Sequence, residues 1–187
     1  MDISKTLYVT DRKTWRDWVK NNYKTEPEIW LIFPKKATGE PRIEYNDAVE
    51  EAMCFGLIDS IMKKLDDDHS AQRFSPRKAK TNYSQPNIER LRTLVAQKKV
   101  IKEVADTLDE ILKAEFIFPP DIVKAIQADK EAWKNYQRFS EPYKRIRIAF
   151  IETARKRPEE FKKRLRHFIE MTAQNKTFGF GGIEKHY

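Results

Sequence analysis

The spacing of hydrophobic residues changes near Ser84, and this change divides the chain into two kinds of structure. Before Ser84, short β-rich apolar runs alternate with segments in which apolar residues recur every three or four positions. After Ser84 the strand signals vanish, and helical spacing continues almost to the end. The pattern predicts an α+β fold, with a small β-sheet or hairpin and helices in the N-terminal part and an all-helical C-terminal part.

The N-terminal part begins with a helical pattern in which Trp15, Trp18 and Val19 share one face. A β-rich run closed by Pro34 follows, and an acidic turn with His69 at its end separates two later strand patterns. The expected elements are therefore a helix at 11–22, a strand at 28–33, a helix at 47–55 and a hairpin of strands 57–65 and 71–74.

The C-terminal part is expected to be a series of helices. Ser84 caps the first one, which has Pro86 in its first turn. The others are expected at 101–112, 121–127, 129–139, from 140 onward and at 158–174. The diproline at 119–120 is the candidate boundary. The predicted domains are an α+β region at 1–115, a helical module at 116–175 that is expected to pack on it, and a Gly/Phe tail at 176–187.

The tail combines glycines with large apolar side chains that are unfavourable in water. Burying Phe178 and Phe180 would contribute about 1.5 to 3 kcal/mol each. Ordering a flexible residue costs roughly 1 to 2 kcal/mol. We expect both rings to pack on the body, with the glycines allowing a tight turn.

Composition narrows the class of protein. The chain has 187 residues, of which 40% are hydrophobic, so it can bury a sizeable core. Its one cysteine, Cys54, excludes an internal disulfide and every multi-cysteine metal site, which fits a reducing compartment. No secretion signal and no run near ~18 apolar residues is present, so we expect a cytoplasmic protein without a transmembrane segment.

The positive charge is concentrated near the C-terminus. The net charge is +8, and residues 141–187 carry 12 Lys or Arg against 6 Asp or Glu, a net of +6. This basic character suggests an acidic protein or anionic small molecule as partner, although the outer faces of helices carry such charge routinely. Glutamates interrupt the stretch and its aromatic residues are needed in the core, so we expect no tight nucleic-acid binding.

The residues give little support for catalysis, a cofactor or a metal. Cys54 lies on the inner face of its helix, and a lone buried cysteine usually acts as a small hydrophobe. The chain has no Gly-x-Ser-x-Gly motif and three histidines. The run Asp66-Asp67-Asp68-His69 lacks the alternating spacing of a calcium loop, so a hairpin turn explains it better than a weak divalent-cation site.

Several motifs follow one another in a recognisable order. They are Trp30-Leu31, Lys35-Lys36 with Gly39, the segment from Ala48 to Ser60, Arg73-Phe74-Ser75-Pro76-Arg77, and Ser84 with Asn87. This set resembles a known family, the YdeI/OmpD-associated or bacteriocin-protection proteins. The likeness covers most of the chain, since 119–167 is similar to the family's helical module. Leu57 and the segment Thr81-Asn82-Tyr83-Ser84 depart from the usual tryptophans. The resemblance implies a link to an outer-membrane porin and to resistance against cationic antimicrobial peptides, without a settled activity.

The candidate site is a group of basic and polar residues that could bind an anion. The guanidinium fork suits carboxylate or phosphate, helix N-termini favour anions, and an aromatic ring can line the floor. Asp59 and nearby glutamates could instead neutralise the bases as structural ion pairs. The group consists of Trp30, Lys35, Lys36, Asp59, Arg73, Arg77, Lys80, Tyr83 and Asn87.

We expect these residues to converge near the start of the helix after Ser84. The sequence thus favours a non-enzymatic binding protein of the YdeI/OmpD-associated type with a basic anion-binding pocket, and the resemblance implies a role in resistance to cationic peptides or bacteriocins. Two alternatives stay open. One is an enzyme acting on a small anionic metabolite in the same pocket, and the other is a weak, nonspecific nucleic-acid binder.

Overall fold

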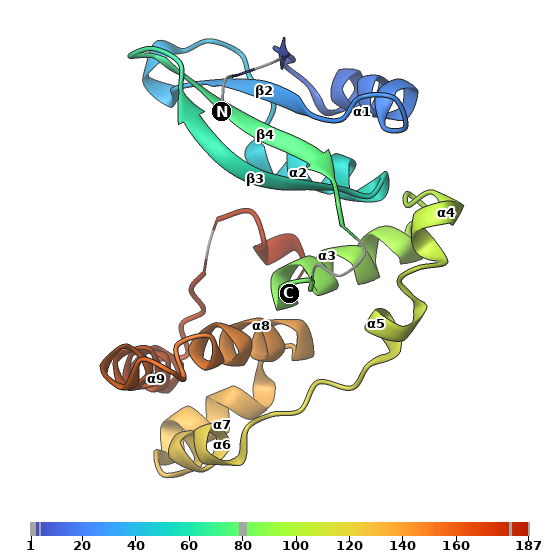
Figure 1. Ribbon diagram of the computed structural model, residues 1–187. Helices are drawn as coiled ribbons and strands as arrows, with labels where there is room; N and C mark the ends of the chain where they lie inside the picture. The colour runs from blue at the N-terminus through green and yellow to red at the C-terminus, as the bar shows by residue number, and fades with distance from the viewer. Residues whose placement is uncertain (1–2, 4, 79–81, 180, 187) are drawn as a thin grey trace. The chain divides into compact units, whose positions relative to one another are not determined.

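A computed structural model describes residues 3, 5–78, 82–179 and 181–186. The chain forms two compact units: Met1–Asn82 with Leu91–Leu112, and Tyr83–Arg90 with Lys113–Tyr187. The first unit contains a four-stranded sheet with helices, and the second is helical (Figure 1). The predicted α+β class is confirmed.

The sheet of the first unit has the strand order β1-β2-β4-β3. The central pair, β2 (Ile29–Pro34) and β4 (His69–Pro76), is antiparallel, with Trp30 opposite Arg73 and Pro34 opposite His69. Strand β3 (Leu57–Lys64) pairs with β4 as the predicted hairpin, and its register shifts between Asp59 and Met62. The sequence did not predict the edge strand β1 (Thr6–Leu7), which is parallel to β2.

Helices α1 (Arg12–Asn22) and α2 (Tyr45–Cys54) pack on one face of this sheet. The Trp15 ring lies 5.3 Å from the Phe74 ring, and Phe33 lies 6.1 Å from Tyr45. Since side chains alternate along a strand, Trp30, Ile32 and Pro34 belong to the other face.

Ion pairs tie α1 to α2. The guanidinium of Arg12 lies 2.9 Å from Asp47 and 3.0 Å from Glu50, and it also pairs with Glu51. Arg16 reaches the second oxygen of Glu51. Both glutamates are 2% exposed, so their charge is compensated within the protein and not by water.

Helix α2 ends where Gly56 adopts a φ of 76°, a conformation that favours glycine. A side chain there would also approach Val104 Cγ2 at 3.1 Å. Val104 belongs to α4 (Lys102–Ala105), which precedes α5 (Asp109–Lys113). The sequence predicted one helix at 101–112, but Thr107 and Leu108 bond three residues back, which tightens the chain into a turn between two short helices.

Helix α3 (Gln85–Ala96) is divided between the units after Arg90. The second unit continues with α6 (Pro120–Gln127), α7 (Lys130–Arg138), α8 (Glu141–Glu152) and α9 (Pro158–Ala173). Its core includes Ile122, Ile126, Tyr143, Ile148 and Phe168. Two short 3₁₀ helices, η1 (Lys36–Thr38) and η2 (Glu184–His186), complete the elements of the described residues. None of the helices among these residues combines the length and apolarity that a membrane crossing requires.

The tail after α9 packs on the second unit through Phe178, as predicted. The ring contacts this unit's core and lies 4.8 Å from the His167 ring. Phe180, the other predicted anchor, lies outside the described residues.

Candidate functional site

The predicted basic group does not converge, because its members follow opposite ends of antiparallel strands. Lys35 and Lys36 come after the C-terminal end of β2, whereas Arg77 comes after the C-terminal end of β4. The six paired positions between those ends span roughly 20 Å at about 3.3 Å per residue. The expected convergence is therefore wrong: Lys35 and Arg77 cannot bind one small anion together.

Trp30 and Arg73 do lie together, and Glu28 joins them. Trp30 Nε1 donates to one Glu28 oxygen at 3.0 Å, and Arg73 Nε donates to the other at 2.6 Å. Lys63 Nζ lies 5.3 Å from the centre of the Trp30 ring. Arg73 is thus held in a structural ion pair with Glu28, which agrees with the predicted alternative that nearby glutamates neutralise the bases. Asp59, named with those glutamates, instead accepts a hydrogen bond from Tyr45 Oη at 2.5 Å.

The remaining predicted residues divide between the two units. Arg77 donates to the carbonyl of Asn82 at 3.4 Å in the first unit. Tyr83 and Asn87 belong to the second unit, where Asn87 Oδ1 accepts from Arg90 at 2.8 Å. Lys80 lies outside the described residues. Anion binding by any of these residues individually stays a prediction.

A different site lies on the sheet face opposite α1 and α2. Tyr8, Ile32 and Leu65 line a hollow of about 270 Å³ together with Glu40, Asp66 and His69. Backbone pairing explains why these side chains lie together. Thr6 pairs with Trp30, which places Tyr8 beside Ile32. Leu65 donates its N–H to the His69 carbonyl, which places Leu65 beside His69.

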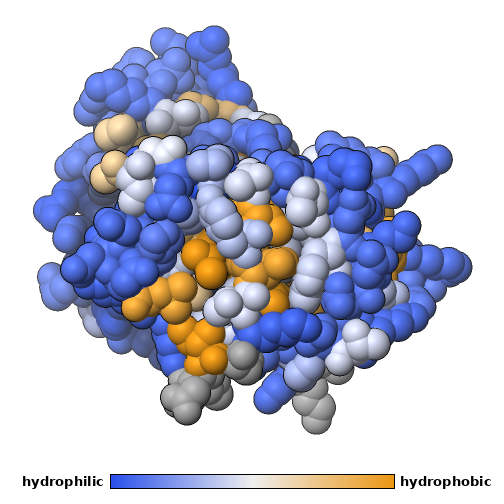
Figure 2. Space-filling model, turned by 90° about the horizontal axis from the view of Figure 1, so that it is seen from above, coloured by the Kyte–Doolittle hydropathy of each residue, from blue (hydrophilic) through white to orange (hydrophobic). Residues whose placement is uncertain are grey.

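Apolar side chains are accessible on this unit. Its exposed large hydrophobic residues are Tyr8 (42%), Tyr45 (37%), Ile61 (46%), Met62 (53%) and Leu65 (38%). Figure 2, which looks from above the view of Figure 1, shows apolar side chains gathered in a patch enclosed by hydrophilic ones. Such patches often mark binding surfaces.

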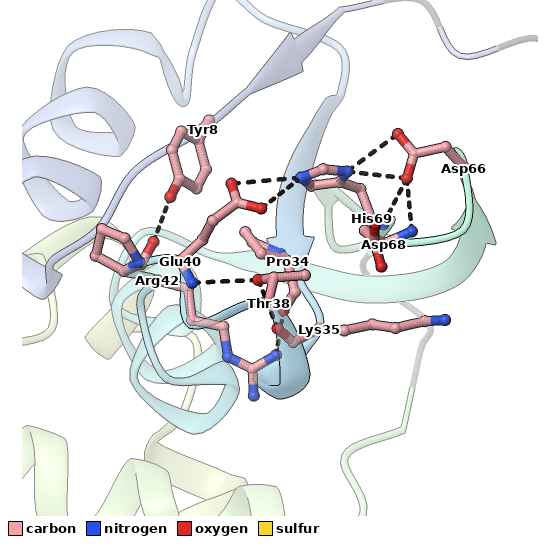
Figure 3. A network of polar contacts seen from close by, with 10 residues as sticks. Tyr8, Pro34, Lys35, Thr38, Glu40, Arg42, Asp66, Asp68 and His69 are labelled. Atoms are coloured by element: carbon pink, nitrogen blue, oxygen red, sulfur yellow. Dashed lines mark hydrogen bonds and ion pairs between the residues drawn. The ribbon is translucent and has the colours of Figure 1, made fainter.

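His69 lies between two carboxylates at the edge of the hollow (Figure 3). Its Nδ1 is 2.9 Å from Asp66 Oδ1, and its Nε2 is 3.3 Å from Glu40 Oε1. Asp66 Oδ1 also accepts the backbone N–H groups of Asp68 and His69, each at 2.8 Å. The acidic run is therefore a hairpin turn closed by an aspartate side chain, as predicted.

The loop that carries Glu40 is fixed by local hydrogen bonds (Figure 3). Arg42 Nη1 donates to the Pro34 carbonyl at 2.6 Å, and the Glu40 N–H donates to Thr38 Oγ1 at 3.2 Å. Tyr8 Oη donates to the Pro41 carbonyl. These bonds hold the Glu40 side chain at the hollow and the Tyr8 ring against its floor.

The two carboxylates favour the charged form of the imidazole. Hydrogen bonding to Asp66, followed by that to Glu40, raises the pKa of His69. The backbone N–H of Asp68 and the His69 ring lower the pKa of Asp66. Because both ring nitrogens face carboxylates, neither is presented to a substrate as a general base. The arrangement suits binding better than proton transfer.

Other chemistry-bearing groups are engaged in the fold. Cys54 is buried, and burial together with the charge of Glu51 raises the pKa of its thiol to about 11, which makes it a poor nucleophile. Across residues 3, 5–78, 82–179 and 181–186, no three histidine, cysteine or acidic side chains are grouped to hold a metal ion.

The basic C-terminal helices contain several internal ion pairs. Arg145 binds both oxygens of the buried Glu89, at 2.7 and 2.9 Å. Arg155 pairs with Asp121 and Glu152, and Arg164 pairs with Glu160. Much of the guanidinium charge of this region is therefore compensated inside the unit.

Two family models match the chain. Residues 7–106 match a family described as a domain of unknown function (DUF8412), and residues 115–175 match one described as "Bacteriocin-protection, YdeI or OmpD-Associated". Comparison with curated proteins and with solved structures gave no match. The resemblance inferred from the sequence is thus confirmed over 115–175, while the motifs from Trp30 to Asn87 lie in the part that matches DUF8412.

Proposed function

Because this chain belongs to the DUF8412 family and its residues 115–175 match the YdeI or OmpD-associated model, we propose that it is a non-enzymatic accessory protein that binds a cationic, amphipathic segment. The segment would occupy the hollow on the sheet face opposite α1 and α2. A cationic antimicrobial peptide or bacteriocin has this chemistry, and the family description includes bacteriocin protection.

The observation that carries this proposal is the apolar floor beside two carboxylates. Tyr8, Ile32 and Leu65 offer contact for an aliphatic stem. Glu40 and Asp66 flank a single imidazole, so the rim stays acidic even when His69 is protonated. A lysine or arginine side chain combines an apolar stem with a cationic head, which matches both features.

The proposed ligand is cationic, whereas the pocket predicted from the sequence was expected to bind an anion. The predicted cations are separated along the sheet or paired, as Arg73 is with Glu28, whereas the hollow is rimmed by acids. The enzyme alternative was predicted for that same anion pocket, where Lys35 and Arg77 lie at opposite ends of the strand pair. At the hollow, the carboxylates on both ring nitrogens of His69 favour a binding role.

Fluorescence anisotropy with a labelled Leu/Lys amphipathic peptide tests the proposal. We expect saturable binding that weakens as salt rises, since exposed charge pairs are screened. Glu40→Gln and Leu65→Ser should each weaken binding about tenfold, because one removes a carboxylate and the other part of the floor. Glu170→Gln, on an exposed position of α9, is the matched control and should bind as the unmodified chain does.

Two results would overturn this function. Equal affinity for a Leu/Glu peptide of the same length would exclude recognition of cationic charge. Unchanged affinity in both hollow variants would exclude this site.

In cells, we propose that the protein acts in the cytoplasm and that Glu40→Gln lowers resistance to a cationic peptide at equal protein abundance.

A further inference from the structure

The residues that follow α9 lie on their own unit in the way a bound peptide lies on its receptor. Residues 176–179 form neither helix nor strand. The N–H of Phe178 donates to Tyr143 Oη at 3.2 Å, and its carbonyl accepts from Arg147 Nη1 at 3.1 Å. Side chains thus bind both backbone groups of one residue, as in the recognition of extended peptides.

The Phe178 ring lies in a pocket of aromatic and cationic groups. The His167 ring meets it edge-on at 4.8 Å, and the Phe168 ring lies 6.3 Å away. The Arg147 guanidinium is 4.5 Å from the ring centre, within the range of a cation–π contact. These contacts select an aromatic side chain over an aliphatic one of similar size.

The residues that contact Phe178 belong to helices α8 and α9, which form part of the core of the second unit. Tyr143 and Phe168 are each 1% exposed and Arg147 is 3% exposed. Tyr143 also packs on Phe139 at 5.1 Å, so its position has support besides the tail. The family match ends at residue 175, immediately before the segment that fills the site.

We propose that this site on α8 and α9 is a recognition site for an extended polypeptide segment that presents an aromatic side chain, with residues 176–179 as its occupant in cis. The site recognises one residue, by contacts with its ring, its backbone N–H and its carbonyl. Phe178 is partly buried and Gly179 follows it, so a partner segment with further contacts can displace the tail. This site is independent of the hollow on the sheet.

The test uses the full chain carrying Phe178→Ser, which empties the site, and a labelled, end-blocked peptide of residues 175–179. We expect this variant to bind the peptide at least tenfold more tightly than the unmodified chain. Phe178→Tyr keeps an aromatic occupant and is the matched control, with binding as weak as that of the unmodified chain. A peptide with alanine in place of its phenylalanine should lose at least tenfold in affinity. His167→Ala, added to Phe178→Ser, should weaken binding about threefold.

Equal peptide affinity in the Phe178→Ser and unmodified chains would overturn the proposal. If Phe178→Ser does not melt cooperatively, hydrogen exchange on the unmodified chain tests the proposal instead. Excess peptide should displace the tail and so speed exchange at the Phe178 amide of the chain at least threefold. An unchanged exchange rate would overturn the proposal. If the unmodified chain is a dimer and Phe178→Ser makes it a monomer, the tail occupies the site of a second copy. That result would also contradict occupation of the site by the chain's own tail.

Discussion

The two units use arginine in the same two ways but to different degrees. In the first unit, Arg12 and Arg16 compensate two buried glutamates and so join α1 to α2, and Arg16 also lies 5.1 Å from the centre of the Phe55 ring. In the second, guanidinium groups pack more closely on rings: Arg164 lies 3.9 Å from the Phe150 ring centre, and Arg155 lies 4.4 Å from that of Phe161. Basic residues that suggested an acidic partner thus contribute to the fold, and net charge is a poor guide to what this protein binds.

The largest expected effect concerns the buried glutamates of the first unit. Glu51→Ala leaves Arg12 and Arg16 without their shared carboxylate, and we expect it to lower the free energy of unfolding by about 3 kcal/mol. Urea unfolding followed by tryptophan fluorescence measures this, since Trp15, Trp18 and Trp30 lie in the first unit. Lys13→Ala, which removes an exposed pair with Asp17, is the control and should leave the midpoint of unfolding nearly unchanged. A loss below about 1 kcal/mol for Glu51→Ala would show that the network is dispensable.

A somewhat smaller effect is expected at the buried pair of the second unit. Arg145→Ala leaves the Glu89 carboxylate buried, with Gln85 Nε2 as a remaining donor at 2.7 Å. We expect a loss of about 2 kcal/mol in urea unfolding followed by circular dichroism. The matched variant Arg155→Ala, at a pair that is 40% or more exposed on both sides, should lose clearly less stability than Arg145→Ala. Equal losses would contradict the distinction between buried and exposed pairs.

Protonation of His69 should stabilise the fold within a limited pH window. Its pKa is raised in the folded state, so its contribution is present below about pH 6.5 and is lost as pH rises through the folded value. The pKa of Asp66 is lowered, so its contribution is present above about pH 4 and is lost at more acidic pH. NMR titration should show that Glu40→Gln lowers the pKa of His69. An unchanged His69 pKa would remove Glu40 from the network.

The smallest effect is expected from anions. Because Lys35 and Arg77 lie at opposite ends of the β2–β4 pair, phosphate and sulfate should raise the melting temperature by less than about 1 °C. A rise of several degrees that Arg77→Ala abolishes would restore the anion site predicted from the sequence. Chloride at equal ionic strength is the control for general salt effects.

The sequence predicted most helices and strands within a few residues, because local signals define them. Asp11 caps α1 through the Thr14 N–H, and Ser140 caps α8 through the Tyr143 N–H. The division of 101–112 into two helices was missed, since its apolar spacing fits one helix while the turn depends on tertiary context. The two-residue strand β1 is too short to give a periodic signal.

The site was harder to predict because it depends on strand register. Asp66 and His69 were recognised as a turn, but nothing local connects them to Glu40 or to Tyr8. The parallel pairing of β1 with β2 brings Tyr8 to Ile32, and the antiparallel pairing of β2 with β4 sends Lys35 and Arg77 apart. Alternation along 28–33 was available as a signal that Ile32 and Trp30 share a face. No local signal showed which helices cover the sheet.

The most direct test of the proposed function is NMR mapping of the methyl groups and histidine rings during titration with the Leu/Lys peptide. We predict that Ile32, Leu65 and His69 shift together along one saturation curve, while Ile122, Ile126 and Ile148 in the second unit do not. Shifts confined to the second unit, or no saturable shift at the hollow, would contradict binding of a cationic segment on the sheet face opposite α1 and α2.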